Sequence, residues 1–196
     1  MLAAALAVAM AASCLADEVS WNAGNGNWDD PANWTPFGVP DNDDVICIGN
    51  LPGVENSVVT LMAPGSGFDE LYVTNGMTLD MNHHELVSFG LASITGTGSR
   101  IIARPDGGGF NQQDFNGTLH VGVGAHFELV GNVPVRLHGA SDSHGTISGR
   151  GFITVSSTIP FENDGIIDPS NNGGLTIQAG HFPDQEIDLD GASGVG

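Results

Sequence analysis

The sequence predicts an all-β protein, a right-handed parallel β-helix (β-solenoid) with an aromatic cap at its amino-terminal end. The first observation is composition: 29 glycines and 10 prolines in 196 residues are too many for helices. The second is periodicity, because short apolar segments rich in Val, Ile, Leu and Thr alternate with polar residues, as strands do. This alternation is too regular for a disordered chain.

Strand spacing alone does not separate a β-helix from a β-sandwich, but two further features favour the helix. The predicted strands are short and frequent, and two stretches match at an offset of 18 residues. That offset predicts that Leu119 stacks on Leu137 and Leu129 on Ile147, about 4.8 Å apart as in neighbouring strands.

Residues 1–16 are apolar and alanine-rich, and we expect them to be a secretory signal peptide cleaved after Ala16. The mature chain is then secreted or exposed at the cell surface. A lipoprotein signal with Cys14 as the acceptor is the alternative. The segment is too short to span a bilayer, so the mature chain is not expected to insert into a membrane. Loss of Cys14 would leave Cys47 as a buried, hydrophobe-like thiol without a disulfide.

Residues 17–50 contain all three tryptophans, Trp21, Trp28 and Trp34, among Gly, Asn and Pro turn formers. The first coil of a solenoid has an exposed apolar end and unpaired strand groups, so its terminal unit must act as a cap. We therefore expect the indoles to cover the first coil, near 45–48. The alternative is a ligand-binding platform, on which the same three indoles stack against sugar rings.

Residues 51–196 are predicted to form the solenoid, with turns at Asn75-Gly76, Gly131-Asn132 and similar pairs. The chain ends at Gly196 without a closing element, so we expect the solenoid to be truncated at its carboxy terminus. Strands are expected at 57–61, 70–74, 77–81, 85–89, 99–103, 118–121, 127–130, 134–138, 145–148, 152–155, 166–168, 175–178 and 186–189.

Two stretches carry a resemblance to a known group. The opening runs Trp21-Asn22, Gly24, Gly26, Asn27-Trp28-Asp29-Asp30-Pro31, Asn33-Trp34, Gly38, Pro40, Asp43-Asp44-Val45 and Ile48; the end contains Asn163-Asp164-Gly165-Ile166 and Gly174-Leu175-Thr176-Ile177. Both resemble secreted β-solenoid surface proteins of planctomycete-type bacteria, which include PEP-CTERM- or dockerin-bearing, autotransporter-like repeat proteins. The resemblance implies an exported, adhesin-like surface protein.

Charge limits the partners. The 23 Asp and Glu face four Arg and no Lys, a net charge of −19, which repels nucleic acids and anionic membranes. Neutral glycans or other surface proteins remain as partners. No cofactor is expected, although the acidic runs Asp41–Asp44 and Asp188–Asp190 leave structural calcium open.

Four histidines give the sharpest candidate for a metal site. The 18-residue match places His120 over His138 and His126 over His144, and stacked imidazoles can share zinc or copper. The alternative is that these histidines are ordinary half-exposed stacking residues, because they follow no fixed ligand motif.

The sequence favours a structural or adhesive surface protein without catalytic activity. The alternative is a carbohydrate-binding or carbohydrate-active β-helix, a hydrolase or lyase. A lyase of this fold normally needs a basic residue, and a hydrolase needs two carboxylates on one face. Asp164 with Asp168, or Asp80 with Glu85, are candidates for such a pair, but turn positions explain them equally well.

Overall fold

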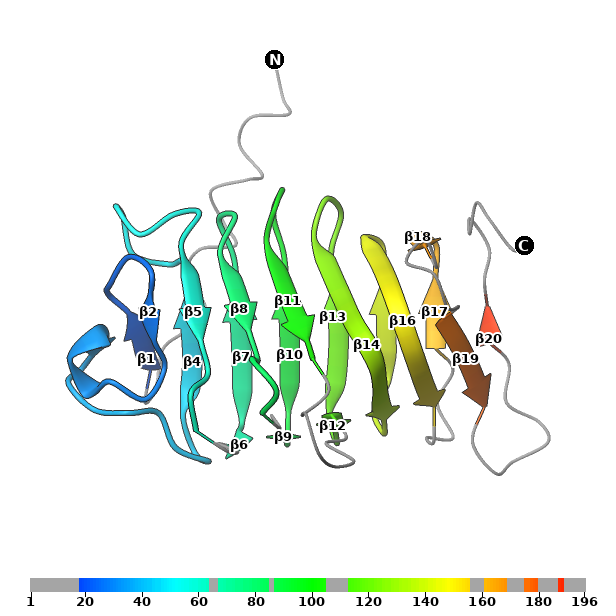
Figure 1. Cartoon of the computed structure of the whole chain (residues 1–196), viewed down its shortest axis with the longest axis horizontal. Helices are drawn as coiled ribbons and strands as arrows, with labels where there is room; N and C mark the ends of the chain where they lie inside the picture. Colours follow the sequence, from blue (N-terminus) through cyan, green and yellow to red (C-terminus); the bar gives the residue numbers. More distant parts are fainter. Residues whose placement is uncertain are drawn as a thin grey trace, which may run out of the picture.

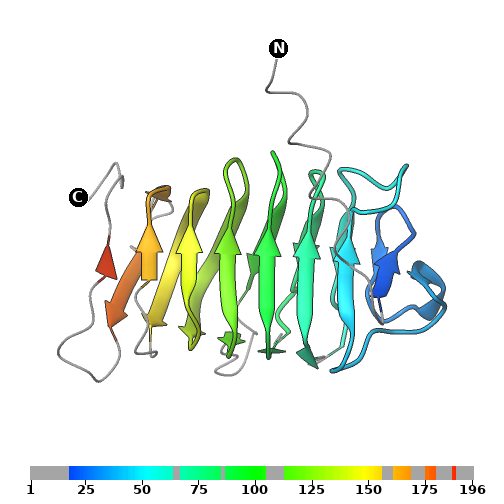
Figure 2. The ribbon, with the colours of Figure 1, turned by 180° about the vertical axis from the view of Figure 1, so that it is seen from behind.

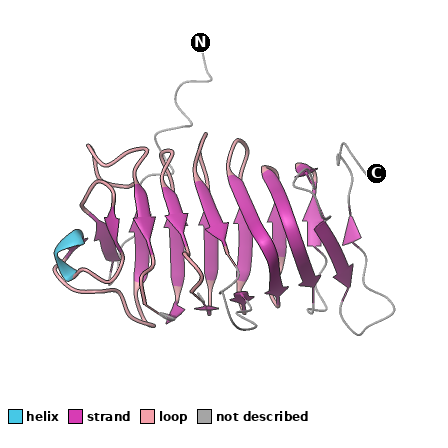
Figure 3. Cartoon of the chain, in the orientation of Figure 1, coloured by secondary structure: helices cyan, strands magenta, loops and turns pink. Residues whose placement is uncertain are grey.

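The computed structural model of the chain describes residues 18–63, 67–84, 87–104, 113–155, 161–168, 175–179 and 187–188. These residues form the predicted β-solenoid (Figures 1 and 2). In Figure 1 the strands at the back run upward, those at the front run downward, and the chain advances from left to right. This rotation is right-handed. Within the described part, the only helical segment is the 3-10 turn η1 (Pro31–Asn33), drawn in cyan in Figure 3.

Sheet A forms the back of the rod in Figure 1, and its strands pair in parallel except at one end. There β3 pairs antiparallel with β1, with Trp34 opposite Trp21. The strands are β1 (Glu18–Trp21), β3 (Trp34–Thr35), β4 (Val45–Ile48), β7 (Glu70–Val73), β10 (Leu91–Ile94), β13 (Thr118–Val121), β15 (Ser141–Ser143), β17 (Phe161–Asn163) and β20 (Ile187–Asp188).

Sheet B has two halves, which are joined because the long strands β14 and β16 run through both. From β4 onward, each coil in the described part thus has three sides: one in sheet A and two in sheet B. The first half contains β2 (Gly26–Asn27), β5 (Val58–Thr60), β8 (Thr78–Asp80), β11 (Arg100–Ala103) and β18 (Ile166–Asp168). The second contains β6 (Gly67–Phe68), β9 (Val87–Ser88), β12 (Gln113–Phe115) and β19 (Leu175–Ala179); β14 is His126–Leu137 and β16 is Thr146–Val155.

The observed register corrects the expected 18-residue step. In sheet A, Glu18 pairs with Val45 and Ser141 with Phe161, so a coil takes 20 to 27 residues. Among the strand pairs that the structure describes, an offset of 18 occurs only between the second halves of β14 and β16.

The predicted contacts therefore change. Leu119 pairs with Ala92 rather than Leu137, which pairs with Phe115 and Val155. Leu129 pairs with Gly149, and its expected partner Ile147 pairs with Phe127. Leu119 lies in sheet A and Leu137 in sheet B, so the two cannot pair. Within sheet B the register shifts between Leu129 and Val133, so the offset is 20 before the shift and 18 after it.

The core is a column of inward side chains that continues from coil to coil. In sheet A, the column that contains Ile48, Val73, Ile94 and Val121 is fully buried and aliphatic. The same column then continues through Ser143 and Asn163, which are buried as well. Within this column, aliphatic burial therefore ends at Val121.

The predicted aromatic cap is present. Trp21, Trp28 and Trp34 are 0%, 0% and 1% exposed. Their rings meet edge to face, with centroids 5.0 Å apart for Trp21–Trp34 and 4.9 Å for Trp28–Trp34, a favourable aromatic geometry. The solenoid begins with β1, and β1 and β4 both lie inside the range 17–50 assigned to the cap.

Cys47 departs from the expectation of a lone thiol. It lies on β4, is 1% exposed and is disulfide-bonded. The chain has two cysteines, and the other, Cys14, lies outside the described residues, as does the whole predicted signal segment. Among the described residues, no helix is both long and apolar enough to cross a membrane.

Candidate functional sites

Two edges of sheet A carry the exposed polar and aromatic side chains that are candidates for function. We call the turns that lead into sheet A its entry edge, with Asp69, Phe89, Asn116 and His138. The turns that leave it form the exit edge, with His144 and Asp164. In Figure 1 the entry edge is at the bottom and the exit edge at the top.

Glycine builds both edges. Phe89, Asn116 and His138 are each followed by a glycine, and these glycines stack so closely that a Cβ at Gly117 would overlap the carbonyl oxygen of Gly90. His144 and Asp164 are likewise followed by glycines. Only glycine allows the backbones of neighbouring coils to approach this closely at the turns. The side chain that precedes each glycine then lies on the outside of the rod.

At the exit edge, two histidines and two carboxylates from successive coils form one network. His120 Nδ1 lies 2.9 Å from Asp142 Oδ2, and His144 Nε2 lies 3.1 Å from the same oxygen. His144 Nδ1 also contacts Asp164. We call these four side chains the His–Asp ladder.

The parallel register creates this ladder. His120 pairs with Asp142, so the two side chains point outward from neighbouring strands. The backbone N–H of His144 donates to the carbonyl of Val121 in the preceding coil. The backbone N–H of Asp164 donates in the same way to the carbonyl of Ser143, so Asp164 lies one coil beyond His144. Each of these contacts joins a ring nitrogen of a histidine to a carboxylate oxygen of the neighbouring coil or of the same coil. The ladder therefore ties three coils together.

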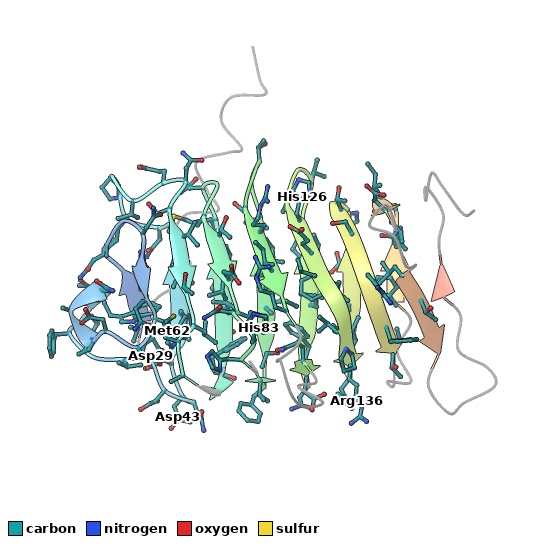
Figure 4. All side chains as sticks on the ribbon, viewed as in Figure 1. Asp29, Asp43, Met62, His83, His126 and Arg136 are labelled. Atoms are coloured by element: carbon teal, nitrogen blue, oxygen red, sulfur yellow. The ribbon has the colours of Figure 1, made fainter. Side chains whose placement is uncertain are left out.

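The predicted histidine columns are wrong in their pairing. His120 pairs with Asp142 rather than His138, and His126 pairs with Arg100 and Thr146 rather than His144. Figure 4 shows His126 on sheet B, near the upper edge of the rod. His120 and His144 do meet, with ring centroids 6.0 Å apart. Among the described residues, no group of three or more His, Cys, Asp or Glu is arranged to hold a metal ion.

The predicted sugar platform is not available, because the faces of Trp21, Trp28 and Trp34 are covered by the core. The acidic run at 41–44 serves as a turn: Asp44 accepts from the Asp41 backbone N–H at 2.7 Å, and Asp41 accepts from that of Asp43 at 3.2 Å. The second run, 188–190, lies outside the described residues except for the backbone of Asp188.

The candidate catalytic pairs fare similarly. Asp80 accepts two hydrogen bonds from the Arg104 guanidinium, at 2.9 and 3.1 Å, and this contact raises the pKa of Arg104. Glu85 lies outside the described residues. The carboxylate of Asp164 contacts the ring of His144, which is not the carboxylate partner that a catalytic pair with Asp168 would require.

At the entry edge the structure shows a hollow of about 500 Å³, lined by Asn42, Asp43, Asp69 and Phe89. Figure 4 places Asp43 at the lower edge, toward the amino-terminal end of the rod. Phe89 is 54% exposed, whereas Phe68 and Phe115 on adjoining strands are fully buried. None of the residues predicted from the sequence as ligand-binding lines this hollow. The signal that could have found it is Phe89-Gly90, which stands where the next coils have Asn116-Gly117 and His138-Gly139.

Comparison of the chain with protein-family models, with curated proteins and with solved structures found no match.

Proposed function

We propose that this chain is a secreted or cell-surface structural and adhesive protein without catalytic activity. The observation that carries the proposal is the parallel ladder, which continues through sheet A from β1 to β20 and ends at the buried tryptophan cap. Each coil is held by its neighbours, so the fold produces a stiff rod with regular outward columns of side chains. Such a rod presents contacts at a distance from its point of attachment.

Composition supports the same role. The net charge of −19 keeps a protein with exposed strand edges soluble outside the cell and disfavours nucleic acids and anionic membranes as partners. Neutral glycans and other surface proteins are the partners that this charge permits. Export through residues 1–16 is part of the proposal. The product exported by a bacterial host should begin at Asp17, and because cleavage removes Cys14, it should carry Cys47 as a thiol without its disulfide.

To test adhesion, the exported chain is attached to beads, and the beads are passed over surfaces coated with insoluble neutral polysaccharides or with bacterial cell walls. The fraction of beads retained after washing is measured. Beads with folded protein should be retained, whereas beads with heat-denatured protein should not. Equal retention of the two would contradict the adhesive role.

A second candidate, a carbohydrate-active β-helix, is favoured by one observation: the His–Asp ladder brings two carboxylates and two histidines together on a solvent-exposed edge. Groups of this kind serve as general acids and bases. Incubation with pectin, alginate, xylan and cellulose separates the candidates. We expect no product above a heat-killed control; release that Asp142→Asn abolishes would establish the enzyme instead.

A further inference from the structure

The Phe89 ring lies on the outside of the rod, next to Gly67. A Cβ at Gly67 would lie 2.6 Å from Cε2 of Phe89 and 2.7 Å from Oδ1 of Asn42. Contacts this short do not occur, so the ring and the amide lie directly over the backbone of β6 because residue 67 is glycine. An aromatic side chain that remains half exposed offers a flat apolar surface to a ligand.

Hydrogen-bonding groups of both kinds surround the ring. Oδ1 of Asn42 accepts from the backbone N–H of Gly67 at 3.0 Å, which leaves the side-chain NH₂ group as a donor. The carboxylates of Asp43 and Asp69 supply acceptors, and none of the described cations forms an ion pair with them. The hollow therefore combines donors, acceptors and an apolar face.

Beyond the hollow, exposed side chains continue along the entry edge in the direction of the rod axis. Backbone hydrogen bonds from Phe89 to Phe68, and from Asn116 to Ser88, place Asp69, Phe89 and Asn116 at equivalent positions in successive coils. Neighbouring coils are about 4.8 Å apart, so these three exposed side chains span about 10 Å. A linear ligand that lies parallel to the axis meets all of them.

The chemistry of these groups selects the ligand. Saccharide hydroxyls both donate and accept, and so match a site with carboxylate acceptors and amide donors, while the C–H face of a sugar ring can rest on an aromatic ring. Anionic ligands are repelled by Asp43 and Asp69 and by the net charge. A basic peptide matches the carboxylates too, and its backbone carbonyls can accept from the Asn42 amide. It offers Phe89 a flexible chain rather than a ring face, so we favour the saccharide and make the basic peptide an outcome of the test.

We propose that the entry edge around Phe89, with Asn42, Asp43, Asp69 and Asn116, is a binding site for a linear neutral saccharide. The proposal rests on the adhesive function proposed above and names its ligand class.

The test is calorimetric titration of the exported chain with four probes: cellohexaose, xylohexaose, hexagalacturonate and decalysine. We expect at least one of the two neutral probes to bind and hexagalacturonate not to bind. Phe89→Ala should weaken that binding at least about tenfold, the factor that corresponds to loss of one good contact. Gly67→Ala should weaken it too, because it displaces the ring without removing it.

Phe152→Ala is the matched control, since Phe152 is also a half-exposed phenylalanine (48%) but lies on β16, away from the hollow. It should bind as the wild type does. Binding of neither neutral probe, equal loss in both phenylalanine variants, or binding of decalysine alone would overturn the proposal.

Failure of this site and failure of the adhesive role are distinguishable. If Phe89→Ala beads are retained as well as wild-type beads, adhesion stands and the Phe89 site fails. If wild-type beads are not retained at all, the adhesive role fails irrespective of the titration.

Discussion

The amino-terminal and later coils share one backbone plan but differ in what fills them. In the coils that contain β4, β7 and β10, sheet A buries Ile48, Val73 and Ile94. In those that contain β15 and β17, the same positions hold Ser143 and Asn163, whose buried Oγ and Oδ1 have no hydrogen-bond partner among the described residues. The later coils gain instead the His–Asp ladder on the outside. Along this column aliphatic burial therefore gives way to buried polar groups toward the later coils, although Ile147, Ile153 and Phe161 still supply buried apolar side chains there.

The largest expected effect is at the cap. Trp28→Ala should lower the free energy of unfolding by about 3–5 kcal/mol, because it deletes a fully buried aromatic side chain. Phe37→Ala is the control in the same segment: Phe37 is 78% exposed, and its loss should change stability by less than about 0.5 kcal/mol. Urea unfolding measures both, and similar losses would contradict the cap.

The aliphatic and polar stretches of one column can be compared directly. Ile94→Ala should cost about 2–5 kcal/mol in urea unfolding, since it removes buried methylenes and leaves a cavity. Ser143→Ala, two coils further in the same column, should be neutral or stabilising by up to about 1 kcal/mol, because it removes a buried hydroxyl without a partner. A costly Ser143→Ala would show that the hydroxyl is satisfied.

The His–Asp ladder should contribute less. His144→Gln is expected to cost about 1 kcal/mol, because charge-assisted hydrogen bonds are weakened where the groups are partly exposed. The loss should shrink in 1 M salt, where the Debye length is about 3 Å. His126→Gln is the control, because no described carboxylate contacts His126, and it should leave stability unchanged at either salt concentration. An equal loss in both variants would contradict the ladder.

The smallest effect is a change in pH dependence at Tyr72. Burial, together with a 2.7 Å hydrogen bond from the phenol to Glu70, raises the pKa of Tyr72 to about 12. The folded pKa lies above the unfolded value near 10, so the contribution is complete below pH 10 and is lost as the pH rises toward 12. Tyr72→Phe should therefore lose less stability than the wild type between pH 9 and pH 12 in urea titrations. Parallel curves would contradict the assignment.

The sequence was sufficient for the architecture and the cap because glycine-bounded alternation and clustered tryptophans reflect local constraints. It was insufficient for the register, because the number of residues per coil varies. The register shift between Leu129 and Val133 also gives β14 and β16 an offset of 20 residues in the first half and 18 in the second. The 18-residue offset predicts separate columns for His120 and His144, whereas the 22-residue offset of sheet A brings both to Asp142. Ser141-Asp142-Ser143-His144-Gly145 and Phe161-Glu162-Asn163-Asp164-Gly165, 20 residues apart, carried the correct spacing.

Hydrogen exchange of the native protein, resolved by strand, tests most directly whether stability is graded along the rod. Our account predicts that backbone amides of β7 and β10 exchange slowest, and that those of β15 and β17 exchange faster through local opening of the polar coils. Equal protection from β7 to β17, or slower exchange in β17 than in β7, would contradict it.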